Sequence, residues 1–200
     1  MKKKRKHSSK NQWTDHLTRQ ALKDRYPARS VYKLMEIQKK FKIMKKGDHV
    51  LDLGCAPGSW LIYAAESVGE NGSAAGIDLK EVSVGLPQNA AAFVGDIVEM
   101  DDHAWGLKHY NLVLSDMAPA TTGRKEADAA RSFELSLTAL EKANSLLVPG
   151  GNFVCKIFQG SDFKIFEQKV KPSFMHHKIF KPESCRKSSK EIYIIGIGKK

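Results

Sequence analysis

The hydrophobic residues of this chain follow two periods, one typical of helices and one typical of strands. Apolar positions spaced by three and four residues predict helices, and short continuous apolar runs predict buried strands. Helices are expected near residues 17–26, 30–37, 58–68, 125–147 and 163–170. Strands are expected near residues 49–53, 73–77, 91–94, 111–115, 152–158, 177–180 and 191–197.

The ends of three helices can be predicted from individual residues. Pro27 must end the first helix, because proline disfavours helical backbone in the residue before it. Ser30 can cap the second helix through its hydroxyl oxygen. The Pro-Gly-Gly run at 149–151 stops the longest helix. The strand at 152–158 would begin after that run.

This order of elements predicts an α/β fold. Strands that alternate with helices form mostly parallel sheets with helices on both faces, and seven strands are expected here. The loop between the last two strands is too short for a crossover, so these strands should pair antiparallel. We therefore expect a mostly parallel seven-stranded sheet with an antiparallel last strand.

Length and composition fit one domain. The chain has 200 residues, 42% of them hydrophobic, enough for one sizeable core. We expect a basic, disordered tail at residues 1–12 and a single domain at 13–200. No apolar run approaches the ~20 residues that a membrane-spanning helix needs, and the basic start lacks the apolar stretch of a secretory signal. The three cysteines form no C-x-x-C pair, so a reducing cytoplasm and no metal site are expected.

Charge is divided unevenly along the chain, whose formal net charge is +11. Residues 1–46 contain 16 Lys or Arg against 3 Asp or Glu, and residues 156–200 contain 11 against 4. The segment between them, 47–155, contains 6 against 15. Basic arms around an acidic centre are typical of proteins that bind a polyanion. Solvated lysines that serve solubility are the alternative.

One segment predicts a binding site for a nucleotide-type cofactor. An apolar run ends in Asp52 and continues as LGCAPGSW at 53–60, a small-residue turn that opens a helix. Such turns lie at the carboxyl edge of open α/β sheets, where ligands bind. A dinucleotide fingerprint would have a further glycine and room for a pyrophosphate. The carboxylate instead favours a cofactor with a cationic centre and no phosphates, which suggests S-adenosylmethionine.

Three further acids favour such a site over an ordinary strand followed by a tight turn. Asp78, Asp96 and Asp116 each follow another strand-like run, so four successive runs end in a carboxylate. Parallel strands end at a common edge of the sheet, which would bring these acids together. Asp78 has the spacing expected of an acid that accepts both ribose hydroxyls.

Six segments together resemble one known family. They are ARSVYKL at 28–34, DLGCAPGSW at 52–60, LSDMAP at 114–119, VPGG at 148–151, KIFQG at 156–160 and SSKEIY at 188–193. From Trp13 to Gly198 the chain resembles the FtsJ-type ribosomal RNA ribose 2′-O-methyltransferases. The resemblance implies the Rossmann-like fold of S-adenosylmethionine-dependent methyltransferases, which agrees with the sheet expected above.

The resemblance implies four catalytic residues, Lys33, Asp116, Lys156 and Glu191. Together they would hold a ribose 2′-hydroxyl in line with the methyl group on the sulfonium. Positioning of this kind is worth about 7–11 kcal/mol. The resemblance assigns Lys156 as the proton acceptor. The residues alone leave open whether Lys156 accepts the hydroxyl proton or orients the hydroxyl lone pair.

The resemblance also implies contacts to the cofactor. The cofactor contacts are Asp52, Gly54, Pro57, Gly58, Trp60, Asp78, Asp96, Ile97 and Asp116. Gly58 and Trp60 would lie against the methionine end, while Asp78 would hold the ribose and Asp96 would read the adenine amino group. Trp60 could equally be an aromatic residue that packs the helix. Candidates for phosphate contacts are Arg29, Arg124, Arg186 and Lys187, which would position RNA without reading its sequence.

The function that the resemblance implies is methylation of a uridine 2′-hydroxyl in the A loop of large-subunit, 23S-type, ribosomal RNA during ribosome assembly. The partner would be ribosomal RNA or a precursor of the large subunit, and the enzyme a cytoplasmic monomer without metal or membrane. Transfer RNA or a messenger cap are alternative substrates. A noncatalytic RNA-binding assembly factor is another reading. A nicotinamide-dependent oxidoreductase is disfavoured by the missing glycine fingerprint.

Overall fold

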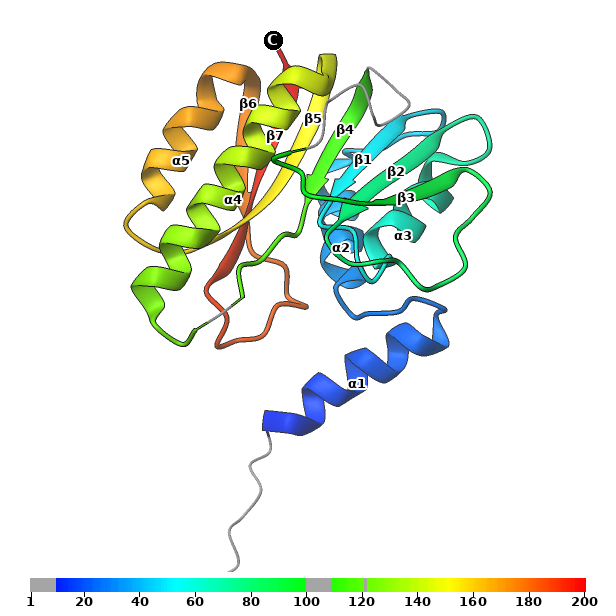
Figure 1. Cartoon of the computed structure of the whole chain (residues 1–200), viewed down its shortest axis with the longest axis horizontal. Helices are drawn as coiled ribbons and strands as arrows, with labels where there is room; N and C mark the ends of the chain where they lie inside the picture. Colours follow the sequence, from blue (N-terminus) through cyan, green and yellow to red (C-terminus); the bar gives the residue numbers. More distant parts are fainter. Residues whose placement is uncertain (1–9, 100–108, 121) are drawn as a thin grey trace, which may run out of the picture.

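The computed structural model describes residues 10–99, 109–120 and 122–200 and confirms the alternation of strands and helices (Figure 1). Its strands are β1 (His49–Leu53), β2 (Ser73–Asp78), β3 (Ala90–Val94), β4 (Tyr110–Ser115), β5 (Leu147–Phe158), β6 (Phe174–Phe180) and β7 (Glu191–Lys199). Its α-helices are α1 (Lys10–Lys23), α2 (Val31–Phe41), α3 (Ser59–Val68), α4 (Lys125–Leu146) and α5 (Phe163–Val170). A short 3₁₀ helix, Lys171–Ser173, joins α5 to β6.

The described strands form one seven-stranded sheet in the order β3-β2-β1-β4-β5-β7-β6. Strand β7 is antiparallel to both of its neighbours, β5 and β6, and the other neighbouring pairs are parallel. The predicted mostly parallel sheet and its antiparallel final pair are confirmed. Strands β2 and β3 lie on one side of β1, and β4 and the later strands lie on the other, so the strand order reverses between β1 and β4. Ligands of such folds bind at this switch point, at the carboxyl ends of the strands.

Helices cover both faces of the sheet, as predicted. Successive residues of a strand face opposite sides. Val50 of β1 and Leu112 of β4 therefore pack with α2 and α3, while Leu51 and Val113 pack with α4 and α5. Buried helix residues complete the two cores: Leu34 and Ile37 of α2 and Leu61 of α3 on one face, Ala139 and Ala143 of α4 and Phe166 of α5 on the other. This two-sided core holds the strand ends at fixed positions.

Two strands begin earlier than the sequence pattern predicts. Strand β5 starts at Leu147, opposite Tyr110, and its register shifts before Asn152 pairs with Leu112. Gly150, with φ +82°, lies in this irregular stretch. Strand propensity does not predict a strand across a Pro-Gly-Gly run, because neither residue type favours regular pairing. Strand β6 likewise begins at Phe174, which is buried, and not at His177.

The start of α2 and the start of the chain also differ from expectation. Ser30 occupies the N-cap position of α2, but its side chain makes no capping hydrogen bond. Its backbone carbonyl instead accepts from the indole Nε1 of Trp60 at 2.8 Å, which ties α2 to α3. Of the tail predicted at 1–12, residues 1–9 lie outside the described residues, and 10–12 form the first turn of α1.

Loss of the Phe153 ring tests the core beneath the site. Phe153 of β5 is fully buried, and its ring stacks on that of Phe174 with centroids 5.9 Å apart. Phe153→Ala is expected to lower the free energy of unfolding in urea by about 3–5 kcal/mol. Ile165→Ala on α5, where the side chain is 48% exposed, is the control and should cost less than about 1 kcal/mol. Equal losses in the two variants would contradict this core.

Candidate active site

The four residues predicted to be catalytic come from four different elements and meet at the carboxyl edge of the sheet. Lys33 lies in the first turn of α2, Asp116 follows β4, Lys156 lies near the end of β5, and Glu191 begins β7. Lys33 Nζ is 2.8 Å from Glu191 Oε2 and 3.7 Å from Asp116 Oδ2. Lys156 Nζ is 3.1 Å from Asp116 Oδ1 and also donates to the Asp116 backbone carbonyl. The four side chains thus form one continuous chain of alternating charge.

Strand register explains why Asp116 and Lys156 meet. Ser115 is paired with Cys155 between β4 and β5, so the residues that follow them leave the strands side by side. On the other side of β5, Lys156 is paired with Tyr193 of β7. The antiparallel direction of β7 is what brings its first residue, Glu191, to the same edge.

Electrostatics keep Asp116 and Lys33 ionised. Burial alone would raise the pKa of Asp116, but the ammonium groups of Lys156 and Lys33 outweigh it and hold that pKa below its ordinary value. Burial alone would lower the pKa of Lys33, but the carboxylates of Asp116 and Glu191 raise it. The site therefore contains a fixed negative charge next to a fixed positive one.

Tyr193 is a fifth member of this cluster that the sequence analysis did not identify. Its hydroxyl donates to Asp116 Oδ1 at 2.6 Å, and the residue is fully buried. Burial, followed by the charges of Asp116 and Glu191, raises its pKa far above the ordinary value, so the phenol stays protonated and remains a donor. Its position two residues after Glu191, hence on the same face of β7, was the available signal.

Asp52 is buried, and neither of its carboxylate oxygens has a hydrogen-bond partner among the described residues. Burial and the charges of Asp116 and Asp78 raise its pKa well above the ordinary value. A buried carboxyl group without partners is costly. A cationic donor bound at this edge would remove that cost. Asp52 therefore fits the cationic cofactor that the sequence predicts.

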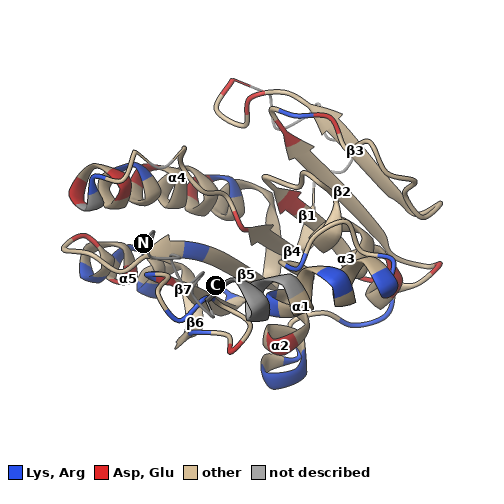
Figure 2. Cartoon of the chain, turned by 90° about the horizontal axis from the view of Figure 1, so that it is seen from below, with Lys and Arg blue, Asp and Glu red and all other residues tan. Residues whose placement is uncertain are grey.

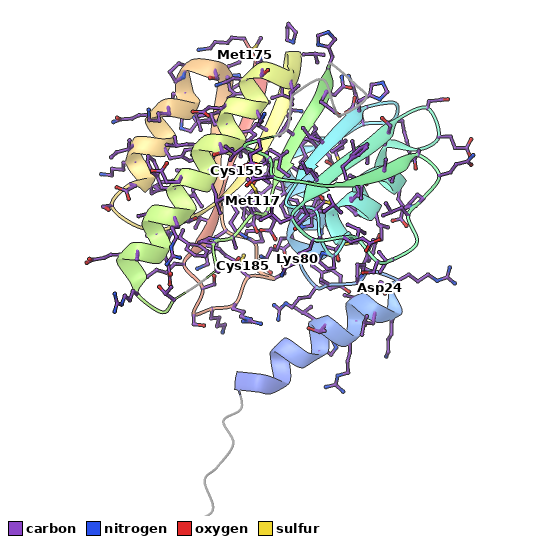
Figure 3. The ribbon with its side chains drawn as sticks, viewed as in Figure 1. Asp24, Lys80, Met117, Cys155, Met175 and Cys185 are labelled. Carbon is purple, nitrogen blue, oxygen red and sulfur yellow. The ribbon has the colours of Figure 1, made fainter. Side chains whose placement is uncertain are left out.

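The turn after β1 is packed too tightly for side chains at its glycines. Gly54 has φ +79°, and a Cβ there would lie 2.5 Å from Cγ of Met117. Gly58 has φ +107°, and a Cβ there would lie 2.9 Å from Cγ1 of Val82. Ala56 and Pro57 between them are joined by a cis peptide bond. Figure 3 shows Met117 toward the middle of the molecule and Met175 at the edge opposite the site.

The two predicted adenosine-binding acids lie at the carboxyl ends of β2 and β3. Asp78 at the end of β2 accepts from the backbone N–H groups of Ala56 at 3.0 Å and Lys80 at 2.9 Å. It thus holds the turn, and its partly exposed carboxylate keeps lone pairs for a ligand. Asp96 after β3 accepts from the backbone N–H of Val98 at 2.9 Å, and the neighbouring Ile97 is buried.

Trp60 lies in the core, where its ring packs 5.9 Å from that of Tyr193 and is 3% exposed. The structure thus places its ring in the packing position that the sequence analysis kept as the alternative. Any contact with a cofactor from Trp60 has to come from its backbone or its ring edge.

The residues predicted to contact RNA divide into two kinds. Arg124, Arg186 and Lys187 are exposed. Arg29 is only partly exposed, and its guanidinium donates to the backbone carbonyl of Ser184 at 2.7 Å. Arg29 therefore also supports the loop that contains Arg186 and Lys187.

The described residues contain neither a candidate membrane span nor a candidate metal site. Among these residues, no helix is long and apolar enough to cross a membrane. In the same part of the chain, no group of three His, Cys, Asp or Glu side chains could hold a metal ion.

The strain at Gly54 can be measured. Gly54→Ala places a methyl group 2.5 Å from Met117 at a positive φ, so we expect a loss of about 1–3 kcal/mol in the free energy of unfolding. Gly85→Ala is the matched control, because a Cβ there would meet nothing within 4 Å. Thermal denaturation of both variants checks the prediction, and an unchanged melting temperature for Gly54→Ala would contradict it.

Asp52 predicts a specific pH dependence. Because its pKa is raised in the folded state, the folded protein keeps a proton that the unfolded chain has already lost above about pH 4. Stability should therefore fall as pH rises from 4 toward the raised pKa. Asp52→Asn should remove this component of the pH dependence. The free energy of unfolding of the variant should therefore rise relative to that of the ligand-free wild type as pH rises. Urea denaturation between pH 4 and 8 measures the difference, and parallel pH curves would contradict the assignment.

Comparison with known proteins was consistent with this geometry. The model of the family described as FtsJ-like methyltransferase matches residues 26–199. Two curated relatives named ribosomal RNA large subunit methyltransferase E are from Desulforapulum autotrophicum and Desulfosudis oleivorans. The first is 66% identical over 96% of this chain and 95% of its own length, and the second 56% identical over 93% and 91%.

Solved structures show the same fold. A putative ribosomal RNA methyltransferase from Plasmodium falciparum has a TM-score of 0.74 and 26% identity, over 87% of this chain and 98% of its own. Fibrillarin from Aeropyrum pernix, solved with S-adenosylmethionine bound, has a TM-score of 0.64 and 16% identity, over 84% and 76%. The Rossmann-like fold class and the resemblance found in the sequence are confirmed. This chain belongs to the FtsJ-like methyltransferase family.

Proposed function

We propose that this protein transfers a methyl group from S-adenosylmethionine to a ribose 2′-hydroxyl of large-subunit ribosomal RNA. The observation that carries the proposal is the chain of four side chains, Glu191, Lys33, Asp116 and Lys156, beside the unpartnered carboxyl group of Asp52. The four connected side chains are suited to a hydroxyl group, and the carboxyl group of Asp52 is suited to a cation. A methyl transferase needs both side by side.

The residues around the β1 turn would hold the cofactor. S-adenosylmethionine supplies a methyl group on a positively charged sulfur. Asp52 offers two buried oxygens to its cationic part, and Gly58, the N-cap residue of α3, would lie against the methionine end. Asp78, which holds the turn, would accept the ribose hydroxyls, and Asp96 with the buried Ile97 would contact the adenine.

Lys156 is placed to act on the hydroxyl of the substrate. Its Nζ has four tetrahedral positions: one bonds Cε, and two are directed at the Asp116 carboxylate and backbone carbonyl. One position remains to face the substrate. It carries either a lone pair, which accepts the hydroxyl proton, or an N–H, which donates to the hydroxyl oxygen. In both cases Asp116 fixes the direction in which Lys156 acts.

Lys33 and Glu191 fix the other side of the hydroxyl. Their 2.8 Å ion pair is largely buried, with side-chain exposures of 13% and 12%. Lys33 also lies 3.7 Å from Asp116, so its ammonium balances the two carboxylates. Side chains fixed in this way lose little further freedom when the substrate binds, which is how positioning accelerates transfer.

Three observations favour large-subunit ribosomal RNA as the substrate. The curated relatives are named for it. The segments 1–46 and 156–200 are strongly basic, which suits a polyanion. Arg124, Arg186 and Lys187 are exposed. The particular target, a uridine of the A loop during ribosome assembly, follows the family resemblance and places the enzyme in the cytoplasm. A noncatalytic assembly factor would not need the complete and connected set of four side chains.

Removal of the Lys156 side chain tests the catalytic assignment. Lys156→Ala is expected to lower methyl transfer by about 10²–10⁴-fold, the contribution of a positioned acid or base. Binding of S-adenosylhomocysteine should stay close to wild type, because Lys156 contacts Asp116 and not the β1 turn. Transfer of labelled methyl to large ribosomal subunits, naked ribosomal RNA and transfer RNA measures the first quantity, and calorimetric titration measures the second.

Lys164→Ala is the matched control, since this lysine is exposed on α5. It should leave both quantities unchanged. Equal loss of transfer and cofactor binding in Lys156→Ala would make the residue structural. Label in transfer RNA alone would keep the enzyme and change the substrate, and no label in any RNA despite cofactor binding would favour the assembly factor.

A further inference from the structure

One acid of α2 has no role in the chemistry above. Glu36 is the only acidic residue of this otherwise basic helix, which Figure 2 labels, and it lies one turn after Lys33. Its Oε2 accepts from the backbone N–H of Glu183 at 2.6 Å, and its Oε1 from that of Ser184 at 2.9 Å. A carboxylate that accepts from two successive backbone amides makes charge-assisted hydrogen bonds that fix both direction and distance.

These contacts hold residues 181–190, which we call the β6–β7 loop, against the N-terminal half of α2. Arg29, just before α2, donates to the carbonyl of Ser184 at 2.7 Å. The peptide groups around Ser184 are therefore held by a carboxylate on one side and a guanidinium on the other. At the far end of the loop, Lys33 binds Glu191 at 2.8 Å. One short stretch of chain thus holds both ends of the loop.

The β6–β7 loop has exposed basic residues on one side and a buried cysteine on the other. Arg186 and Lys187 are exposed. Cys185, immediately before them, is buried at 4% exposure, and Figure 3 labels it below Cys155 and Met117 and above α1. Burial, and then the carboxylate of Glu191, raises the pKa of the Cys185 thiol to about 12. The loop therefore packs its inner side on the active site and turns its basic side chains outward.

We propose that Glu36 is a positioning residue for RNA, which acts by holding the β6–β7 loop so that Arg186 and Lys187 face the substrate beside the active site. The inference rests on the proposed function, because it concerns how the same site receives RNA. Glu36 lies 147 residues from its partner Glu183, so the contact joins distant parts of the chain. Phosphate contacts fix the register of a nucleic acid only when the groups that make them are themselves fixed.

The state of the loop can be measured without RNA. All three cysteines are free and buried, so a thiol reagent should modify the folded protein slowly. In Glu36→Ala we expect modification of Cys185, located by mass spectrometry, to become about tenfold faster, because a hydrogen bond to a charged group is worth about one decade or more in an equilibrium. Glu70→Ala, which removes an exposed acid between α3 and β2, is the control and should leave the rate unchanged.

The effect on RNA is the second readout. Glu36→Ala should weaken binding of a large-subunit ribosomal RNA transcript by about tenfold at constant salt. It should raise KM for RNA more than it lowers kcat, with S-adenosylhomocysteine affinity unchanged. Glu36→Gln keeps one acceptor oxygen and should lie between wild type and Glu36→Ala. It also keeps the test valid if the alanine variant folds poorly.

A double-mutant comparison separates positioning from general stability. If Glu36 acts through Arg186 and Lys187, then Glu36→Ala should have little further effect on RNA affinity once both are alanine, because effects that share one route do not add. Full additivity would overturn the inference, as would wild-type RNA affinity in Glu36→Ala. A wild-type protein that binds the transcript but transfers no methyl group to any RNA would instead refute the proposed function.

Discussion

The arrangement of the active edge depends on the largely buried carboxylate of Asp116, whose side chain is 17% exposed. A carboxylate in this position is stable only when cations and donors surround it. Here Lys156, Lys33 and the Tyr193 hydroxyl all contact its oxygens. Since these groups come from β5, α2 and β7, satisfying one charge fixes the relative positions of three elements. Removal of any of the three would take away part of this compensation, so the geometry of the proposed catalytic side chains and local stability are coupled at this site.

Asp52 differs from Asp116 in its hydrogen-bond partners. It lies one strand away from Asp116 and is more deeply buried, and its oxygens have no partner among the described residues. The described residues therefore satisfy one carboxyl group and leave the other without a partner, which is why we propose it as the group that meets the cationic cofactor. The switch point between β1 and β4 places the two acids on neighbouring strands, so a cationic ligand at Asp52 lies next to the groups that Asp116 organises.

Many elements of the fold and several residues of the candidate site could be predicted from the sequence, because they depend on patterns within single segments. Apolar periodicity is a property of each segment, so most strands and helices and the acids at the strand ends were predicted and confirmed. The first residues of β5 were not, because tertiary pairing with Tyr110 overrides the Pro-Gly-Gly run. Tyr193 and Glu36 were missed because their partners lie 77 and 147 residues away, one of them a backbone amide that no sequence pattern marks. The sequence allowed two interpretations of Trp60, a cofactor contact or a packing residue, because only the fold shows that its ring lies beside that of Tyr193.

In the proposed function, Asp116 and its lysines present a ribose hydroxyl, and not a base, to the methyl donor. The most direct measurement is nucleoside analysis of large-subunit ribosomal RNA after incubation with the protein and labelled S-adenosylmethionine. All label should be recovered in 2′-O-methyluridine, and it should be absent when Lys156→Ala replaces the wild type. Label in a nucleoside methylated on its base would contradict the proposed function.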